Sequence, residues 1–342
     1  MKSLKEIFES SNQKPIAFII KGSPDPDSIA SSMALLSYYQ LIGGEGKIYY
    51  KDYISHSANK AMVNILDVQM TDYINKTPTE NYYVVCDHSD PYVEEYDKVE
   101  CLLYVDHHKH DTECKKVCLS QIVETDAGAC SSIITKLLAD TDFFTNSPIS
   151  SRVATALAYG IKADTDNLDS AREKDWNAMK ILSQYCNKEL LQKITRSRIS
   201  TQTVSVLKAA LTNEKTEQNW LYAGVGFLQE TYRDSIALVA DEMIRRQGID
   251  NVLVYAIIEK SEGPVIQGSI RSIDTGFDID SFVKSFSITG GGRKHKGGFE
   301  ISLGFWGNCE NREMLEEFTR TTIEGKLKSI LGTAKKKKEN EK

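Results

Sequence analysis

The sequence predicts an α/β protein, in which a parallel sheet flanked by helices is followed by a second, smaller α+β domain. Short apolar runs alternate with amphipathic stretches through the first half of the chain, an order typical of parallel sheets wrapped by helices. The chain has 342 residues, which is long for one hydrophobic core and natural for two domains. After a polar helical stretch, the pattern changes to strands, a glycine-rich segment and a closing helix.

The first domain is predicted to span residues 1–187 and to contain the parallel sheet. Its strands are expected to be apolar because helices would cover both faces of the sheet. The expected strands are Pro15–Lys21, Lys47–Lys51, Tyr82–Cys86 and Leu102–Val105. The expected helices or helical turns are Asp27–Leu41, Ala58–Leu66, Pro91–Tyr96, Gly128–Ala139, Ile149–Tyr159 and Glu173–Asn187.

A helical linker is predicted over residues 188–218, and the second domain over residues 219–330. This domain opens with an apolar segment and closes with a long helix. Its expected elements are Trp220–Phe227, helix Ser235–Gln247, strands Val252–Ile258, Val265–Arg271 and Phe299–Phe305, and helix Glu310–Leu327. Residues 331–342 end in KKKKENEK and are expected to form a disordered, solvated basic tail.

Composition narrows the functional class. The net charge of −6 argues against a protein that coats long duplex nucleic acid, because such binding needs many cations to neutralise phosphates. No apolar run approaches the roughly 20 residues that span a bilayer, so no membrane partner is expected. The polar first residues lack the apolar centre of a signal peptide, and a cytoplasmic location is expected. The sequence is compatible with a homodimer.

The seven cysteines are predicted to be ordinary reduced thiols. Their number is odd and they are scattered along the chain, unlike a secreted disulfide framework. Cys114 and Cys118 are spaced to share a helical face or a metal, but no second thiol pair completes a zinc set.

Acidic residues follow three of the predicted strands. Asp25 and Asp27 come after the first strand, Asp87 after the third, and Asp106 with its two histidines after the fourth. Ligands of open parallel sheets bind outside the carboxyl ends of the strands, so these side chains are expected to converge. The alternative for Ser23–Ser28 alone is a proline-bearing turn in which Asp27 caps the next helix.

So many carboxylates cannot all stay ionised in one pocket without compensation. Divalent cations supply that compensation. Carboxylates with one or two imidazoles, His107 and His108, suit Mn²⁺ or Mg²⁺ better than zinc. Asp164, at the end of a predicted helix, is expected at the same edge.

Asp106-His107-His108 resembles the motif from which the DHH phosphoesterases take their name. Further motifs of that family stand in the right order, and the resemblance extends from Lys21 to about Gly304. In the second domain they resemble the substrate-binding domain associated with the DHH domain. The remaining motifs are Pro24–Asp27, Asp87 after a strand, Ala127–Ser132, Gly160–Thr165, Gly268–Ser272 and the glycine-rich Gly290–Phe299.

The resemblance implies two metal ions, most simply Mn²⁺. Asp25 and Asp27 would each hold a different ion and Asp87 would bridge both. His107 and Asp164 would complete the second site. In the resemblance, His108 faces the substrate phosphate or the attacking water, and Asp106 orients the histidines.

The chain departs from the family pattern at two cationic positions. Lys21 stands where many members have a histidine, and a protonated lysine has no lone pair for a metal. The first metal site is therefore expected to be weakened, with Lys21 pairing with the carboxylates or the substrate phosphate. Arg293 stands where the glycine-rich segment usually has histidine, and His295 follows two places later. The roles of His88 and Asp166 stay open.

Substrate contacts are predicted from Lys21 and from the second domain. Glycine allows a backbone to approach a phosphate closely, and arginine offers a planar fork for it. The plainer alternative is a glycine turn with solvated basic residues. The predicted contacts of the second domain are Arg271, Gly291, Gly292, Arg293 and His295.

The sequence therefore predicts a Mn²⁺-dependent phosphoesterase that hydrolyses small nucleotides or short RNA or DNA. Oligoribonucleases and 3′-phosphoadenosine-5′-phosphate phosphatases are the resembling types. Exopolyphosphatase or cyclic-dinucleotide hydrolysis is the alternative within the same chemistry. A catalytically silent nucleotide-binding protein is the alternative from another class.

Overall fold

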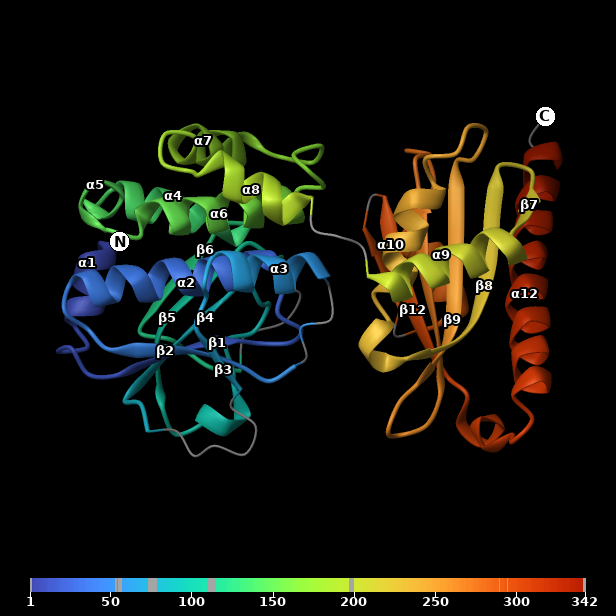
Figure 1. The fold of residues 1–342 in the computed structure, drawn as a ribbon, viewed down its shortest axis with the longest axis horizontal. Coiled ribbons are helices and arrows are strands. Elements are labelled where there is room, and N and C mark those ends of the chain that lie inside the picture. The colour runs from blue at the N-terminus through green and yellow to red at the C-terminus, as the bar shows by residue number, and fades with distance from the viewer. Residues whose placement is uncertain are drawn as a thin grey trace. The chain divides into compact units, whose positions relative to one another are not determined.

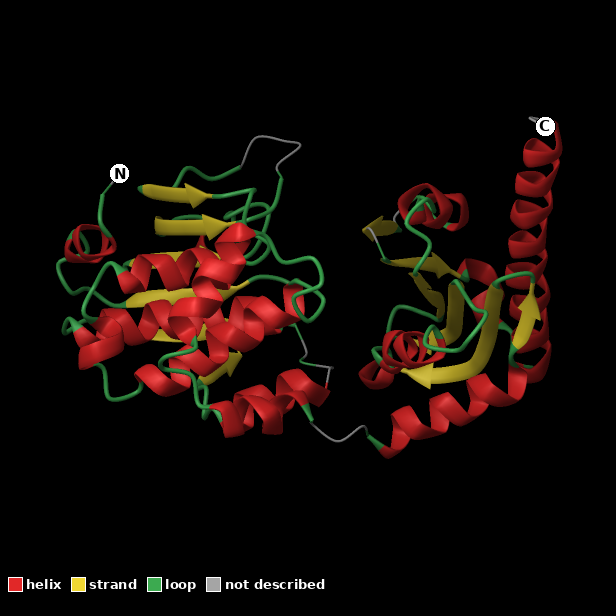
Figure 2. Ribbon diagram, turned by 90° about the horizontal axis from the view of Figure 1, so that it is seen from above, coloured by secondary structure: helices red, strands yellow, loops and turns green. Residues whose placement is uncertain are grey.

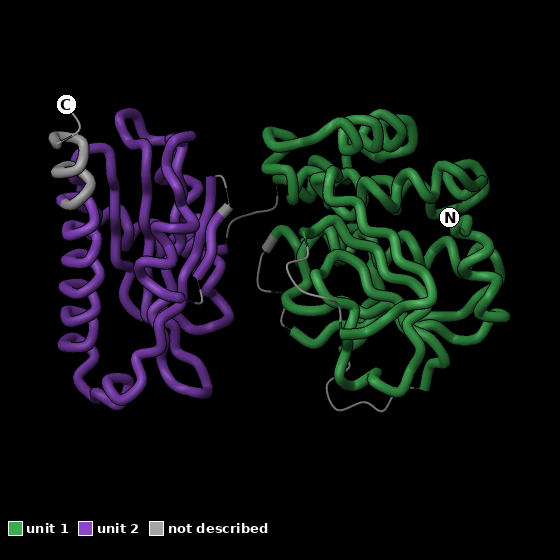
Figure 3. Tube along the Cα trace, turned by 180° about the vertical axis from the view of Figure 1, so that it is seen from behind, with its two compact units in different colours: residues 1–198 green, residues 199–342 purple. Residues whose placement is uncertain are grey.

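The computed structural model describes residues 2–52, 54, 57–72, 79–109, 115–196, 200–288, 290–293 and 295–340, with the backbone alone at Ser57, at Arg293 and over 333–340. The chain forms two compact units, Met1–Arg198 and Ile199–Lys342 (Figure 3). The linker expected over 188–218 falls across this division, with one helix on each side. Among the described helices, none combines the length and the apolar character needed to cross a bilayer.

The first unit contains a six-stranded sheet in which every strand pair is parallel (Figure 1). The strand order is β3-β2-β1-β4-β5-β6, so β1 lies inside the sheet and its five residues are all buried. This confirms the predicted fold class. The strands are β1 (Ile16–Ile20), β2 (Gly46–Tyr50), β3 (Met70–Asp72), β4 (Tyr82–Cys86), β5 (Glu100–Asp106) and β6 (Ser120–Val123).

One face of this sheet is covered by helices, as Figure 1 shows. Phe18 and Ile20 of β1 face the helices, and helix α2 packs in turn against α4 and α6. Of the expected helix Pro91–Tyr96, only its last three residues are helical. The helices are α1 (Leu4–Glu9), α2 (Pro26–Leu41), α3 (Ser57–Ile65), α4 (Cys130–Ala139), α5 (Phe143–Asn146), α6 (Ser150–Asp164), α7 (Glu173–Leu182), α8 (Lys188–Thr195) and the 3₁₀ turn η1 (Glu94–Tyr96).

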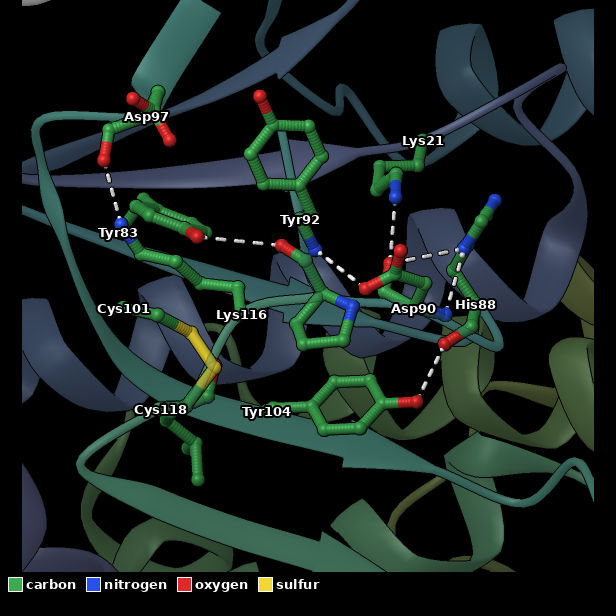
Figure 4. The surroundings of a disulfide bond; sticks show 12 residues. Lys21, Tyr83, His88, Asp90, Tyr92, Asp97, Cys101, Tyr104, Lys116 and Cys118 are labelled. Atoms are coloured by element: carbon green, nitrogen blue, oxygen red, sulfur yellow. Dashed lines mark hydrogen bonds between the residues drawn. A yellow bond between two sulfur atoms is a disulfide. The ribbon is translucent and has the colours of Figure 1, made fainter. Parts of the chain in front are cut away.

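The opposite face of the sheet contains a disulfide bond between Cys101 and Cys118 (Figure 4). The prediction that all cysteines are reduced is therefore wrong for this pair. Pairing of β6 with β5 brings the two together, because the amide of Leu119 donates to the carbonyl of Cys101. The other described cysteines are free, and Cys114 lies outside the described residues.

The second unit contains a mixed six-stranded sheet with the order β11-β12-β10-β9-β8-β7. Only β8 and β9 pair in parallel; the other pairs are antiparallel. The strands are β7 (Lys215–Glu217), β8 (Trp220–Gln229), β9 (Asn251–Glu259), β10 (Val265–Ser272), β11 (Gly291–Arg293) and β12 (Lys296–Ser302).

Helices pack on both faces of this second sheet (Figure 2). Helices α9 and α10 contribute to one core, while α11 and α12 contribute to the other. The backbone of α12 is helical over residues 331–340, where a disordered tail was expected. The elements are α9 (Thr201–Asn213), α10 (Ser235–Met243), α11 (Ile279–Phe286), α12 (Arg312–Asn340) and the turns η2 (Glu230–Tyr232) and η3 (Gly304–Asn308).

Candidate metal centre

The carboxyl ends of β1, β4 and β5 bring the acidic motifs of the first unit together. These strands are neighbours in the sheet, so the residues after them meet at one edge. Asp87 follows β4 with a φ of 57°, a left-handed conformation that is uncommon outside glycine. Its amide still donates to the carbonyl of Val105 at 2.9 Å, which ties this turn to β5.

Four side chains form a compact group of potential ligands: Asp27, Asp87, His107 and Asp164. One ligand atom of each lies within 4.8 Å of the others. The Nε2 atom of His107 lies 3.3 Å from Asp87 Oδ1 and 3.3 Å from Asp164 Oδ2. Despite these contacts, His107 Nε2 and Asp87 Oδ1 are buried without a hydrogen-bond partner among the described residues. Orphaned buried atoms of this kind are rare, and here they converge on one point.

The electrostatics of this group are those of crowded buried carboxylates. Burial, followed by repulsion from Asp164, raises the pKa of Asp27 to about 7. Burial and the charge of Asp27 likewise raise the pKa of Asp87 well above its usual range. Burial alone would lower the pKa of His107, but its contacts with Asp164 and Asp87 raise that pKa to about 11. Oxygen and imidazole donors held this closely fit a divalent cation, which would compensate the charge.

Helix α4 fixes the position of Asp27. The two carboxylate oxygens of Asp27 accept the backbone amides of Cys130 and Ser131 at 2.6 and 2.7 Å. The start of α4 is fixed in turn by the buried Asp175, which accepts the amide of Gly128 and the hydroxyl of Ser132. Asp175 was not predicted from the sequence, because nothing around it distinguishes it from other helical acids.

Asp25, and not Asp27, caps the helix that follows the proline-bearing turn. It is the N-cap of α2, and its Oδ1 accepts the amide of Ser28 at 2.8 Å. The cap of this helix is thus Asp25, whereas the alternative considered from the sequence gave it to Asp27. Burial and repulsion from Asp164 raise the pKa of Asp25, so it lies near the metal-ligand group without being one of its four members.

Asp106 contacts the ring of His108. Its Oδ1 lies 2.8 Å from His108 Nδ1, while the Tyr104 hydroxyl lies 3.1 Å from its Oδ2. Burial alone would raise the pKa of Asp106, but the hydrogen bond from His108 lowers that pKa to about 2. His108 is the more accessible histidine, and it also belongs to a second potential ligand group with Asp87 and His107.

Lys21 and His88 both contact the backbone of Asp90 (Figure 4). Lys21 Nζ donates to the Asp90 carbonyl at 2.6 Å, and His88 Nδ1 accepts the Asp90 amide at 3.1 Å. Burial lowers the pKa of His88, and the charge of Lys21 lowers it further. His88 belongs to neither ligand group found among the described residues. Asp166 begins three consecutive left-handed residues after α6.

Of the predicted substrate residues of the second unit, Arg271 lies on β10, Gly291, Gly292 and Arg293 form β11, and His295 lies in a turn directly before β12. Gly291 and Gly292 of β11 pair with Gly298 and Gly297 of β12. Gly292 packs so closely on α11 that an added Cβ would lie 2.6 Å from a methyl carbon of Ile279. This glycine therefore has a packing reason as well as the expected substrate role.

The basic residues of the same segment have protein partners. The guanidinium of Arg271 pairs with Asp241 and donates to the Ser269 hydroxyl at 2.9 Å. His295 Nδ1 lies 3.1 Å from the Ser272 carbonyl. The side chain of Arg293 lies outside the described part of the chain.

Comparison with known proteins finds a family model that matches part of the first unit. Residues 16–161 match the N-terminal domain of the DHH family. An uncharacterized protein of Methanocaldococcus jannaschii is 29% identical over 337 residues, which cover 97% of this chain and 67% of that protein.

Two solved structures extend this comparison to the fold. An exopolyphosphatase-related protein from Bacteroides fragilis is 16% identical, with a TM-score of 0.64 over 94% of this chain and 96% of its own. It shows the fold across both units. A putative family II inorganic pyrophosphatase of Methanococcus jannaschii is 14% identical, with a TM-score of 0.43 over 89% of this chain and 98% of its own, a likeness too weak to bear on function.

Proposed function

We propose that this chain, whose residues 16–161 match the N-terminal domain of the DHH family, is a Mn²⁺-dependent phosphoesterase of short oligonucleotides or small nucleotide phosphates. One observation carries the proposal. Buried ligand atoms of Asp87 and His107 lack hydrogen-bond partners in the described structure, at the edge where a parallel sheet binds its ligands.

Asp27, Asp87, His107 and Asp164 would hold a divalent cation. Such a cation supplies Lewis-acid polarisation of a phosphoryl oxygen and acidifies water. The imidazole in the donor set favours Mn²⁺ over Mg²⁺. Asp25, which lies outside this group, would serve a second and weaker site together with Asp87.

His108 would face the substrate phosphate. Asp106 contacts its Nδ1, and its Nε2 would approach a phosphate oxygen or a water molecule. The lowered pKa of Asp106 keeps that carboxylate ionised, which fixes the tautomer of the ring. His108 would thereby donate a hydrogen bond or a proton to the reacting phosphate.

The second unit would recognise the rest of the substrate. Arg271 and the backbone of Gly291 and Gly292 would contact a distal phosphate or a base, together with Arg293 and His295. A substrate that is hydrolysed at the first unit and bound by the second would be short. We propose nucleotides or short oligonucleotides as these substrates.

A substrate panel tests the proposal. Dinucleotides, 3′-phosphoadenosine-5′-phosphate, cyclic dinucleotides and polyphosphate would each be incubated with Mn²⁺, Mg²⁺ or EDTA, and product release measured. We expect Mn²⁺-dependent release from the first two. Cleavage of polyphosphate alone would overturn the nucleotide assignment, and binding without turnover across the panel would favour a silent nucleotide-binding protein.

A metal titration tests the two-site part separately. Calorimetry of the wild-type protein with Mn²⁺ should give two unequal sites. Full activity with a single stoichiometric ion would contradict the weaker second site but not the phosphoesterase proposal.

A further inference from the structure

The Tyr104 side chain joins two segments of the metal centre. Tyr104 lies on β5 and is fully buried. Its hydroxyl oxygen lies 2.7 Å from the His88 carbonyl and 3.1 Å from Asp106 Oδ2. Because a hydroxyl has one proton, it donates to one of these acceptors at a time, and both lie within reach. One atom thus contacts the turn after Asp87 and the carboxylate that holds His108.

The turn after Asp87 is held by side chains from three neighbouring strands (Figure 4). Lys21, just after β1, binds the Asp90 carbonyl, and Tyr83 of β4 donates to the Pro91 carbonyl at 3.3 Å. Tyr104 of β5 supplies the third contact. A left-handed aspartate costs conformational energy and persists only when its surroundings hold it, and these contacts hold the backbone that directly follows Asp87.

Asp106 extends the connection to His108. One of its oxygens accepts from the His108 ring and the other lies against the Tyr104 hydroxyl. A carboxylate bound at both oxygens cannot rotate freely, and the ring that it holds inherits this orientation. The hydroxyl of Tyr104 therefore lies two hydrogen bonds from the imidazole of His108.

We propose that Tyr104 is a positioning residue that couples the Asp87 turn to the Asp106–His108 pair. Its hydroxyl contacts the His88 carbonyl and the Asp106 carboxylate, so it would act through the groups that it orients. The kinetic consequence rests on the proposed function, whereas the structural consequence does not. Removing the hydroxyl takes away the one donor that the His88 carbonyl and the buried Asp106 carboxylate share.

The chain offers a matched control in Tyr83. It is as fully buried as Tyr104, packs in the same core, and its hydroxyl also binds the carbonyl of a residue after Asp87. The difference is that the Tyr104 hydroxyl also lies 3.1 Å from Asp106 Oδ2, whereas the Tyr83 hydroxyl donates to the Pro91 carbonyl. Tyr104→Phe is expected to lower kcat roughly 10- to 100-fold with KM little changed, as for other changes behind a metal site. Tyr83→Phe should cause a loss severalfold smaller.

Hydrogen exchange decides the proposal whether or not the enzyme assay works. In Tyr104→Phe, amide exchange should rise in both 87–91 and 106–109, whereas in Tyr83→Phe it should rise only in the first segment. Equal exchange patterns in the two variants, or a change in one segment only for Tyr104→Phe, would overturn the coupling. A wild type without activity on the whole panel would sink the proposed function and leave this comparison intact.

A measurement on the wild type covers the case in which Tyr104→Phe does not fold. Selective ¹³Cζ labelling of tyrosine in mixed H₂O and D₂O reports how slowly each hydroxyl proton exchanges. Tyr104 should show a slowly exchanging hydroxyl, and rapid exchange would overturn its role as a fixed donor.

Discussion

The motif residues of the two units differ in whether their polar atoms have partners within the protein. In the first unit, the motif side chains converge, and buried atoms of Asp87 and His107 have no hydrogen-bond partner among the described residues. In the second unit, Arg271 is paired with Asp241, and the amide of Gly292 donates to Asp280. Unpaired buried polar atoms cost stability, so a protein that keeps them together gains when a ligand pairs them. The motif side chains of the first unit would therefore gain most from a bound ligand, whereas Arg271 and Gly292 of the second unit already have protein partners.

The largest effect on activity is expected from Asp87→Asn in the first unit. Replacing one carboxylate oxygen by an amide nitrogen removes the negative charge of Asp87 and one metal-ligating oxygen from the ligand group. We expect kcat to fall by more than about 100-fold, beyond the loss typical of residues behind a metal. Mn²⁺-dependent product release and Mn²⁺ calorimetry would measure the change.

Asp90→Asn is the control for that experiment. Asp90 lies in the same turn, and its carboxylate accepts the amide of Tyr92, a bond that asparagine keeps. An equal loss of activity in both variants would mean that the turn, and not the ligand group, is what matters.

A smaller effect is expected from Arg271→Lys in the second unit. Lysine keeps the charge but loses the planar fork that pairs with a carboxylate or phosphate. If this residue contacts substrate, KM should rise roughly tenfold, about the free energy of one charge-assisted hydrogen bond, with kcat less affected. Arg245→Lys, on an exposed arginine of the same unit, is the matched control. A fall in kcat at constant KM would contradict a binding role.

The pH dependence of stability tests the charge state of the first unit. Without metal, the raised pKa values of Asp27, about 7, and His107, about 11, mean that the folded state holds protons that the unfolded state has released. The free energy of unfolding should therefore fall as pH rises from about 5 to 8, by of order 1 kcal/mol per pH unit. Urea unfolding in EDTA would measure it.

Saturating Mn²⁺ should reduce this fall in the free energy of unfolding with pH, because bound metal favours the deprotonated ligands. The lowered pKa of Asp106 acts in the other direction. Its contribution is present above the ordinary aspartate pKa and is lost as pH falls toward about 2. A metal-free protein that gains stability between pH 5 and 8 would contradict the crowding of buried carboxylates.

Much of the first unit's fold was predictable because its buried strands are continuous apolar runs, as in β1 and β4. The short edge strands β3 and β6 were not predicted, since three or four residues such as MTD or SQIV carry no clear periodicity. Because β6 was not predicted, the disulfide was not predicted either. Its cysteines meet only once β6 pairs with β5, a contact that no local pattern of the sequence reports.

The sequence predicted which residues of the site lie close together. It did not predict the contacts that each of them makes. Order along the chain placed Asp87 and Asp106 at one sheet edge. It could not show that Asp27 binds the start of α4 more than a hundred residues away, or that Asp25 caps α2. Nor could it show that Asp241 pairs with Arg271, because that contact depends on how α10 packs against β10. These are tertiary contacts between residues without a distinctive local pattern.

The smallest effect on activity is expected from removing the disulfide, which lies in the first unit but away from its candidate metal centre. Cys101 and Asp106 lie on the same strand, five residues apart, which is about 16 Å along β5. Cys118→Ala should lower the free energy of unfolding by about 3 kcal/mol, the value for a loop of this size, while kcat stays close to wild type.

Cys186→Ala, which removes a partly buried free thiol of the same unit, is the control for this experiment. Urea unfolding and product release on the same preparations would separate stability from activity. A large loss of kcat in Cys118→Ala alone would show that the bond also positions His108, since Cys118 follows that histidine by ten residues. The candidate metal centre would then depend on the whole length of β5, and not only on its carboxyl end.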